Sequence, residues 1–239
     1  MAMSVEPHAL QTLSDAFSYR FRDPAALAQA LTHQSIKGET NNERLEFLGD
    51  AALESAVSHL LYRMVSTMSE GLMASVRGNL VNTQTLCAVG LRLGLIEHVR
   101  FAPSVPEVAR RNKLLADALE AVIALISIEA GEKAVQATCE HIFAPEFQII
   151  REHPEKFGRP PAKTRLQGYL QKRRFPLPQY NLVTYRSDPV QPYFRVQCDV
   201  GLGLYRAEGE GHTLLEAEQN AADCLIASQN WDGSATTHA

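Results

Sequence analysis

The feature that most limits how this chain can fold is a break in its middle. Residues 151–162 contain three prolines and a glycine (Pro154, Pro160, Pro161 and Gly158). Proline removes a backbone donor and clashes inside a helix, and both residue types mark turns and loops. We therefore expect a linker over residues 151–162, with a separate domain on each side.

Before the break, the apolar residues recur at helical spacing. Leu45, Leu48 and Ala52 follow this period, and so do the apolar residues of the segment 114–128. Such periodicity is typical of α-helices, and β-branched alternation is scarce here. We expect residues 1–150 to form an all-helical domain.

After the break, the pattern changes to a mixture of helix and strand. Leu166, Tyr169 and Leu170 indicate a short helix, and a closing helix is marked by apolar residues around Ala221 and Leu225. Three strands are expected between them, over residues 180–185, 193–200 and 204–209, with Gly201 and Gly203 in the second turn. The expected fold class is an all-α domain followed by a small α+β domain, in which residues 163–230 have the order α-β-β-β-α with an antiparallel three-stranded sheet. Residues 231–239 are expected to be a frayed tail.

Composition excludes several classes of protein. The chain is 45% hydrophobic and 21% charged, which is ordinary for a globular protein. Its four cysteines are scattered and form no zinc-ligand or disulfide pattern, which favours a reducing compartment. No secretory signal is apparent, and the most apolar stretch, Ala121–Ile128, is too short to span a bilayer. We expect a cytoplasmic protein with no membrane partner and no small-molecule cofactor.

Bulk charge gives no support for a nucleic-acid partner. Residues 1–158 carry 14 Lys and Arg against 19 Asp and Glu, and residues 159–239 carry 9 against 8. Neither half is strongly basic, as a generic nucleic-acid binder would be. A nucleic-acid function must therefore be argued from particular residues.

Three acids share one face of a predicted helix. Glu43, Glu46 and Asp50 stand at i, i+3 and i+7, on a different face from the apolar residues. Acids on one face repel each other unless cations bind there. A solvated acidic face is the alternative, and this segment alone does not exclude it.

A second acidic pair lies in a much more apolar setting. Asp117 and Glu120 stand at i, i+3 inside the apolar segment 114–123, where unpaired acids are rarely left buried. If this helix packs beside the first, they converge with Glu46 and Asp50. Four hard oxygen donors suit Mg²⁺, with Mn²⁺ as the alternative, and the absence of His and Cys from these segments disfavours zinc.

These segments resemble the motifs of a known family. Residues 42–53 read NERLEFLGDAAL, residues 115–121 read LADALEA, and residues 30–35 read ALTHQS. The first resembles the signature of the ribonuclease III family, the second its other acidic motif, and the third the short motif before the signature. The resemblance runs from about Leu13 to Ala227.

The resemblance implies a specific activity. Members of this family hydrolyse phosphodiester bonds in double-stranded RNA, leaving 5′-phosphate and 3′-hydroxyl ends, and ribosomal RNA precursors are the targets it suggests. It implies that Glu46, Asp50, Asp117 and Glu120 bind the metal and that Asp50 and Glu120 are the catalytic centre. Glu43 is assigned a supporting role in RNA contact or subunit pairing, and an ordinary acid at a helix N-terminus remains the alternative.

Phe47 lies inside the acidic signature. From the residues alone, ordinary core packing would explain it. The resemblance implies instead that this aromatic side chain inserts into a cavity of a second subunit, so that the protein is a homodimer with one cutting site for each strand.

The segment after the break resembles a double-stranded RNA-binding domain, which reads the shape of a duplex through its minor grooves and phosphates. Gln167 and Gln171 share a helix face and are the expected minor-groove pair, with an ordinary solvated face as the alternative. Lys163, Lys172 and Arg173 are further expected RNA contacts, although the basic run at 172–174 is equally explained as a solvated helix end.

One departure from the resemblance concerns the strength of RNA binding. Thr213, Leu214 and Leu215 stand where such domains usually carry a Ser or Thr followed by two basic residues.

Two other functions compete with that of a nuclease. A catalytically silent duplex-RNA-binding protein or chaperone of the same fold is disfavoured because all four acids are present. An unrelated helical phosphohydrolase acting on small nucleotides is disfavoured by the C-terminal domain.

Overall fold

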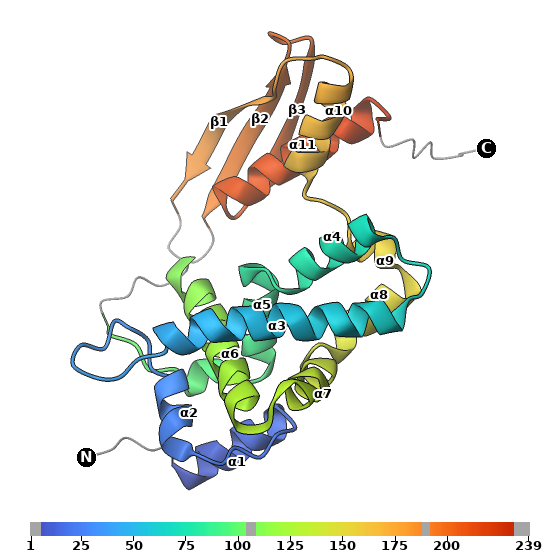
Figure 1. Ribbon diagram of the computed structural model, residues 1–239. Coiled ribbons are helices and arrows are strands. Elements are labelled where there is room, and N and C mark those ends of the chain that lie inside the picture. The colour runs from blue at the N-terminus through green and yellow to red at the C-terminus, as the bar shows by residue number, and fades with distance from the viewer. Residues whose placement is uncertain (1–5, 104–108, 188–191, 232–239) are drawn as a thin grey trace. The chain divides into compact units, whose positions relative to one another are not determined.

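The computed structural model describes residues 6–103, 109–187 and 192–231. The chain divides into two compact units, Met1–Arg159 and Pro160–Ala239 (Figure 1). The first is helical and the second contains the sheet, as the expected fold class requires. That prediction is confirmed.

The linker predicted over residues 151–162 is shorter in the structure. Helices extend through Phe157 on one side and resume at Ala162 on the other, so only residues 158–161 lie between helices. Phe157 packs against the core of the first unit, and its carbonyl accepts a hydrogen bond from Asn79 Nδ2 at 2.6 Å. This packing holds residues 151–157 in the first unit, despite the helix-breaking residues.

The first unit consists of helices, and residues 31–42 form a longer connection between the second and the third of them. Each of three helices begins with a side chain that accepts a backbone N–H: Asp23, Ser69 and Asn82. In chain order, the helices of the first unit are α1 (Pro7–Ala16), α2 (Pro24–Ala30), α3 (Glu43–Met64), α4 (Glu70–Leu80), α5 (Thr83–Arg92), the 3₁₀ turn η1 (Leu95–Glu97), α6 (Ala109–Ala130), α7 (Glu132–Ile142), α8 (Ala144–Glu152) and α9 (Pro154–Phe157).

The centre of this unit is the crossing of α3 and α6, the two longest helices (Figure 1). Residues 114–119 and 121–126 of α6 are buried on every side of the helix, with only Glu120 between them partly exposed. The backbones of the two helices come very close at Gly49. A Cβ atom at this position would lie 1.8 Å from the carbonyl oxygen of Glu120. Glycine is therefore required for this crossing, because any side chain would force the backbones apart.

The second unit is a three-stranded antiparallel sheet with two helices. The strands β1 (Gln179–Arg186), β2 (Tyr193–Val200) and β3 (Tyr205–Gly211) pair in the order β1-β2-β3. The helices α10 (Ala162–Lys172) and α11 (Leu214–Ser228) cover one face of the sheet (Figure 1). Gly201 and Gly203 have positive φ angles in the β2–β3 turn, where they were expected.

Trp231 corrects the expected start of the tail. It packs against the core of the second unit, with its ring 5.4 Å from that of Tyr205. A large aromatic side chain is more stable buried than exposed, so Trp231 belongs to the second unit and not to the expected tail. The rest of the predicted tail lies outside the described residues. Among the described helices, none is both long and apolar enough to cross a membrane.

Candidate functional site

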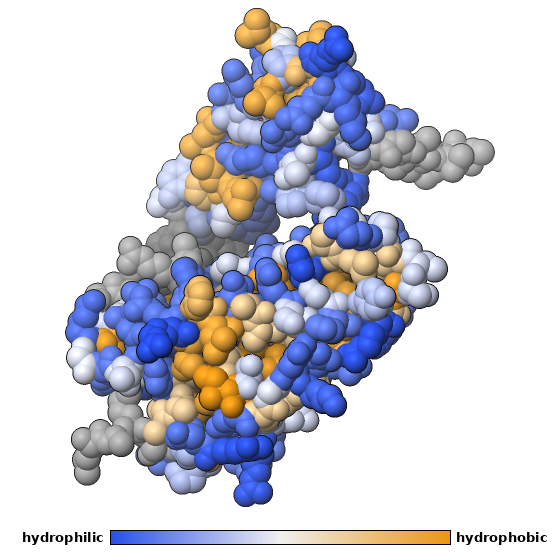
Figure 2. Space-filling model, in the orientation of Figure 1, coloured by the Kyte–Doolittle hydropathy of each residue, from blue (hydrophilic) through white to orange (hydrophobic). Residues whose placement is uncertain are grey.

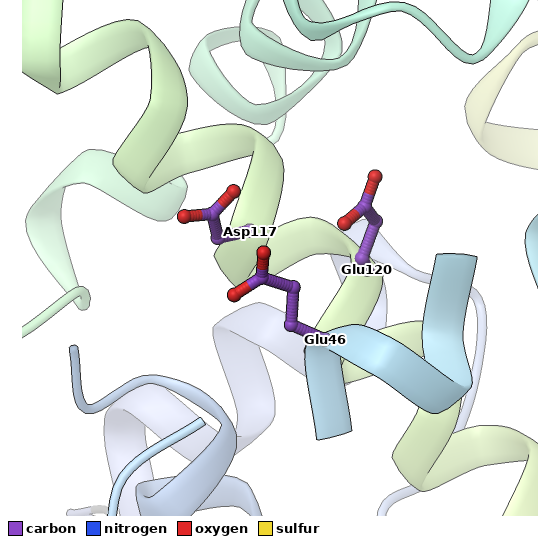
Figure 3. A group of neighbouring side chains, drawn as sticks. All are labelled: Glu46, Asp117 and Glu120. Carbon is purple, nitrogen blue, oxygen red and sulfur yellow. The ribbon is translucent and has the colours of Figure 1, made fainter. Parts of the chain in front are cut away.

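Three carboxylates meet at the crossing of α3 and α6. Glu46 comes from α3, and Asp117 and Glu120 come from α6 (Figure 3). Each offers an oxygen, and these oxygens all lie within 4.8 Å of one another. The predicted convergence of the two acidic segments is thus present in the structure. Asp50, the fourth expected acid, lies one turn further along α3 on the wall of the same pocket, outside this group of three.

The pocket that holds these acids has a volume of about 500 Å³. Glu43 and Phe47 from α3 also line it, together with Gln34 and Thr83, for which sequence analysis predicted no role. Glu43 is exposed in the first turn of α3, so its position agrees with both interpretations offered for it.

The electrostatics of the site favour a bound cation. Asp117 is only 5% exposed, and burial raises its pKa. Burial, followed by the charges of Asp50, Asp117 and Glu46, raises the pKa of Glu120 to about 8. A divalent cation would relieve this repulsion, and an all-carboxylate set is the donor chemistry that hard cations prefer. The residues present therefore fit a divalent metal ion.

Lys113 also reaches this cluster, and sequence analysis missed it. Its Nζ lies 2.7 Å from both Asp117 carboxylate oxygens and 3.3 Å from Oε1 of Glu46. Burial opposes its charge, but the hydrogen bond and charge of Asp117 outweigh that effect and raise the pKa of Lys113. Its place four residues before Asp117, on the same helix face, was the available signal.

The segment before α3 fixes the start of that helix. The backbone N–H of Asn42 donates to the carbonyl of Thr32 at 2.9 Å, and the N–H of His33 donates to the carbonyl of Arg100 at the same distance. The Thr32 hydroxyl is itself buried and donates to the carbonyl of Ala28. The 30–35 motif thus anchors the helix that carries Glu46 and Asp50.

The side chain of Phe47 is 83% exposed, so the interpretation that it packs in the core of its own chain is wrong. Leu48 and Ile128 are also exposed, and Figure 2 shows an apolar area where α3 crosses α6. Single exposed apolar residues are unremarkable, but a cluster of them is typical of an interaction surface.

The second unit presents most of its expected RNA contacts on α10 and at its end. Gln167, Gln171, Lys172 and Arg173 are exposed there. Lys163 is only half-exposed: its ammonium pairs with Glu218 and lies 4.6 Å from the centre of the Tyr180 ring. Its positive charge is therefore already paired with a carboxylate of the same unit.

Comparisons with known proteins agree with this geometry. Residues 23–146 match the family model described as Ribonuclease-III-like, and residues 162–225 match the double-stranded RNA binding motif. The chain is 38% identical to "Ribonuclease 3" of Delftia acidovorans over 222 residues, which is 92% of this chain and 96% of that protein. It is 37% identical to "Ribonuclease 3" of Xanthomonas axonopodis pv. citri, over 89% of this chain and 93% of that one. The chain belongs to the ribonuclease III family.

A solved structure of the family agrees. The nuclease domain of ribonuclease III from Campylobacter jejuni matches with a TM-score of 0.55 and 32% identity, over 59% of this chain and 99% of that one. That nuclease domain shows structural flexibility in a region involved in dimer formation. Both the predicted family and the predicted enzyme class, ribonuclease III, are confirmed. The alternative of an unrelated phosphohydrolase is wrong.

In this member of the family, the start of α11 carries no added positive charge where the resemblance leads us to expect it. Leu214 is 44% exposed and Leu215 is 61% exposed. Thr213 Oγ1 accepts the backbone N–H of Glu216, while the Glu216 carboxylate accepts that of His212 at 2.8 Å. This reciprocal cap stabilises the helix but places a negative charge where a phosphate would approach.

Replacing Leu214 and Leu215 together by lysine is expected to strengthen duplex binding. Each new phosphate contact should add roughly 0.9 to the slope of log K against log salt, a value established for B-form DNA, so the slope should steepen by about 2. The measurement is fluorescence anisotropy of an RNA duplex with the full chain in EDTA, over a range of salt.

The matched control places lysines at exposed Cys224 and Ala227, at the other end of the same helix. These should change the slope by much less, because they lie on the order of 15 Å away along the helix. Equal slopes for the wild type and the Leu214 and Leu215 variant would show that these positions do not face phosphates.

Proposed function

We propose that this chain cuts double-stranded RNA by metal-dependent hydrolysis, leaving 5′-phosphate and 3′-hydroxyl ends. The observation that carries the proposal is the meeting of Glu46, Asp117 and Glu120 in one pocket, with Asp50 on its wall. We propose Mg²⁺ as the ion, because every donor is a carboxylate oxygen, with Mn²⁺ as a substitute.

A divalent ion bound there would supply Lewis acidity to a phosphate oxygen and to an attacking water. Glu46 from α3 and Asp117 from α6 would hold such an ion together. Burial and the neighbouring carboxylates raise the pKa of Glu120 to about 8, so its carboxyl group holds a proton near neutral pH, and a bound cation would favour its charged form as a ligand. Asp50 is more exposed than these three and is placed to contact water and substrate. We assign Asp50 and Glu120 as the catalytic centre, with Glu43 in support.

The second unit would hold the duplex. We assign Gln167 and Gln171 to the minor groove and Lys172 and Arg173 to phosphates, since all four are exposed on α10 or at its end. Lys163 belongs to the same group only if duplex binding breaks its pair with Glu218. We further propose ribosomal RNA precursors as substrates and the cytoplasm as the compartment, where the four free cysteines would stay reduced.

Glu120→Gln is expected to lower the rate of duplex cleavage by about 100-fold or more at saturating Mg²⁺, because the amide removes a charged ligand without changing size. The assay follows a labelled RNA duplex, and a parallel reaction with EDTA should give no products. Ligation of the products to an adaptor with a 3′-hydroxyl end reports the 5′-phosphates.

Glu54→Gln is the control, because Glu54 is an exposed acid one turn beyond Asp50 on the same helix but does not line the pocket. It should cut at the wild-type rate. A wild type that binds the duplex but never cuts it would favour the silent RNA-binding alternative.

We also propose that the protein works as a homodimer formed through the exposed side chain of Phe47 on α3. A phenylalanine exposed to this degree is unfavourable in water, and burying it against a second copy would remove that penalty. A recess of about 230 Å³ between α3 and α4, lined in part by Leu61, Tyr62 and Met73, offers an apolar site for such a ring. In a two-fold dimer this contact would be made twice.

Sedimentation should give a mass near twice 26.4 kDa for the wild type at micromolar concentration. Phe47→Ala should shift it towards the monomer, since truncating a buried phenylalanine costs roughly 3–5 kcal/mol. Ile149→Ala, at an exposed apolar residue on α8, is the control and should leave the dimer intact. A wild-type monomer would contradict the proposed assembly without affecting the metal site.

A further inference from the structure

Lys113 holds an unusual position for a residue beside a proposed metal site. It projects from α6 one turn before Asp117, and its ammonium donates to both oxygens of that carboxylate at 2.7 Å. The same ammonium lies 3.3 Å from Glu46 on α3. One positive group therefore bridges two of the three carboxylates that come closest together.

The two ends of this ion pair differ in their contact with water. The Asp117 side chain is 7% exposed, whereas that of Lys113 is 64% exposed. A buried carboxylate without a partner destabilises a fold, so Asp117 depends on a nearby cation. Lys113, in contrast, has a long flexible stem and can move into water without disturbing the core.

A divalent ion and this ammonium would use the same oxygens. A metal ion bound to Asp117 and Glu46 would lie about 2.1 Å from their oxygens. The Lys113 ammonium already contacts these two carboxylates, so the ion would be its close neighbour. Two cations so close would repel strongly within a partly buried pocket. The site therefore favours one of them at a time.

We propose that Lys113 is an internal counter-ion of the metal site, whose ammonium covers the Asp117–Glu46 side of the cluster and moves out when a divalent ion binds. This inference rests on the proposed metal site. Lys113 is then a positioning residue that keeps the carboxylates together in the metal-free protein. By competing with the ion, it also sets the metal concentration at which the site fills.

The test compares Mn²⁺ binding by the full chain without RNA, measured by the loss of the free-Mn²⁺ electron paramagnetic resonance signal. Lys113→Met removes the charge and keeps most of the stem, and it should bind Mn²⁺ about fivefold or more tightly than the wild type. Lys133→Met removes one charge from an exposed residue on α7 and should bind like the wild type. Lys113→Arg retains the charge and should not show the tighter binding.

Thermal unfolding gives a second readout. Without metal, Lys113→Met should unfold at a lower temperature than the wild type, because Asp117 has lost its partner. Saturating Mn²⁺ should then raise the unfolding temperature of Lys113→Met more than that of the wild type. Lys113→Gln, a second neutral variant, serves the same comparison if the methionine variant does not fold.

The outcomes separate this inference from the proposed function. If the wild type binds Mn²⁺ but the neutral variants bind it equally or more weakly, the counter-ion role is overturned and the metal site stands. If the wild type binds no Mn²⁺ and Glu120→Gln behaves identically, the metal site itself fails and the counter-ion role fails with it.

Discussion

The close crossing of α3 and α6 at Gly49 is the constraint on which the rest of the first unit depends. With no side chain at this position, the backbone of α3 can approach the carbonyl of Glu120 directly. The acids of α3 flank the glycine, and those of α6 lie opposite. These acids repel one another, so the apolar surfaces of both helices must hold them together. The core of the unit, which includes Leu53, Val57 and Leu119, provides that attraction.

Much of this arrangement could be predicted from local patterns. Helical spacing predicted α3 and α6, alternation predicted β2 to the residue, and the two acidic segments were expected to converge. These features are encoded within a few turns of helix or one strand. The resemblance to the ribonuclease III motifs supplied the rest of the functional interpretation, including the second subunit for Phe47.

What sequence analysis missed depends on contacts between distant segments. Phe157 lies in the segment predicted as a linker and Trp231 in the predicted tail, yet each packs against a core whose shape no local pattern reveals. The linker was predicted too long for this reason. Lys113 looks like an ordinary solvated residue at the start of an apolar helix. Only the packing of α3 beside it shows that Glu46 lies within reach as well as Asp117.

Charge is distributed differently in the two units. The first carries its excess negative charge partly in the site, where Lys113 or, in its place, a divalent ion would offset it. The second has little net charge, and its α11 begins with an apolar pair and a glutamate where phosphates would approach. Under the proposed function, we therefore expect duplex binding to depend largely on α10 and on the acidic pocket of the first unit.

The dependence of the site on the helix crossing can be measured directly by Mn²⁺ binding to Gly49→Ala. The added methyl group has to push α3 away from Glu120, so we predict much weaker Mn²⁺ binding and a loss of about 1–3 kcal/mol in the free energy of unfolding. Gly78→Ala on α4, where a Cβ meets nothing within 4 Å, should bind Mn²⁺ normally and be no less stable. A Gly49→Ala variant that folds and binds Mn²⁺ with wild-type affinity would contradict the account.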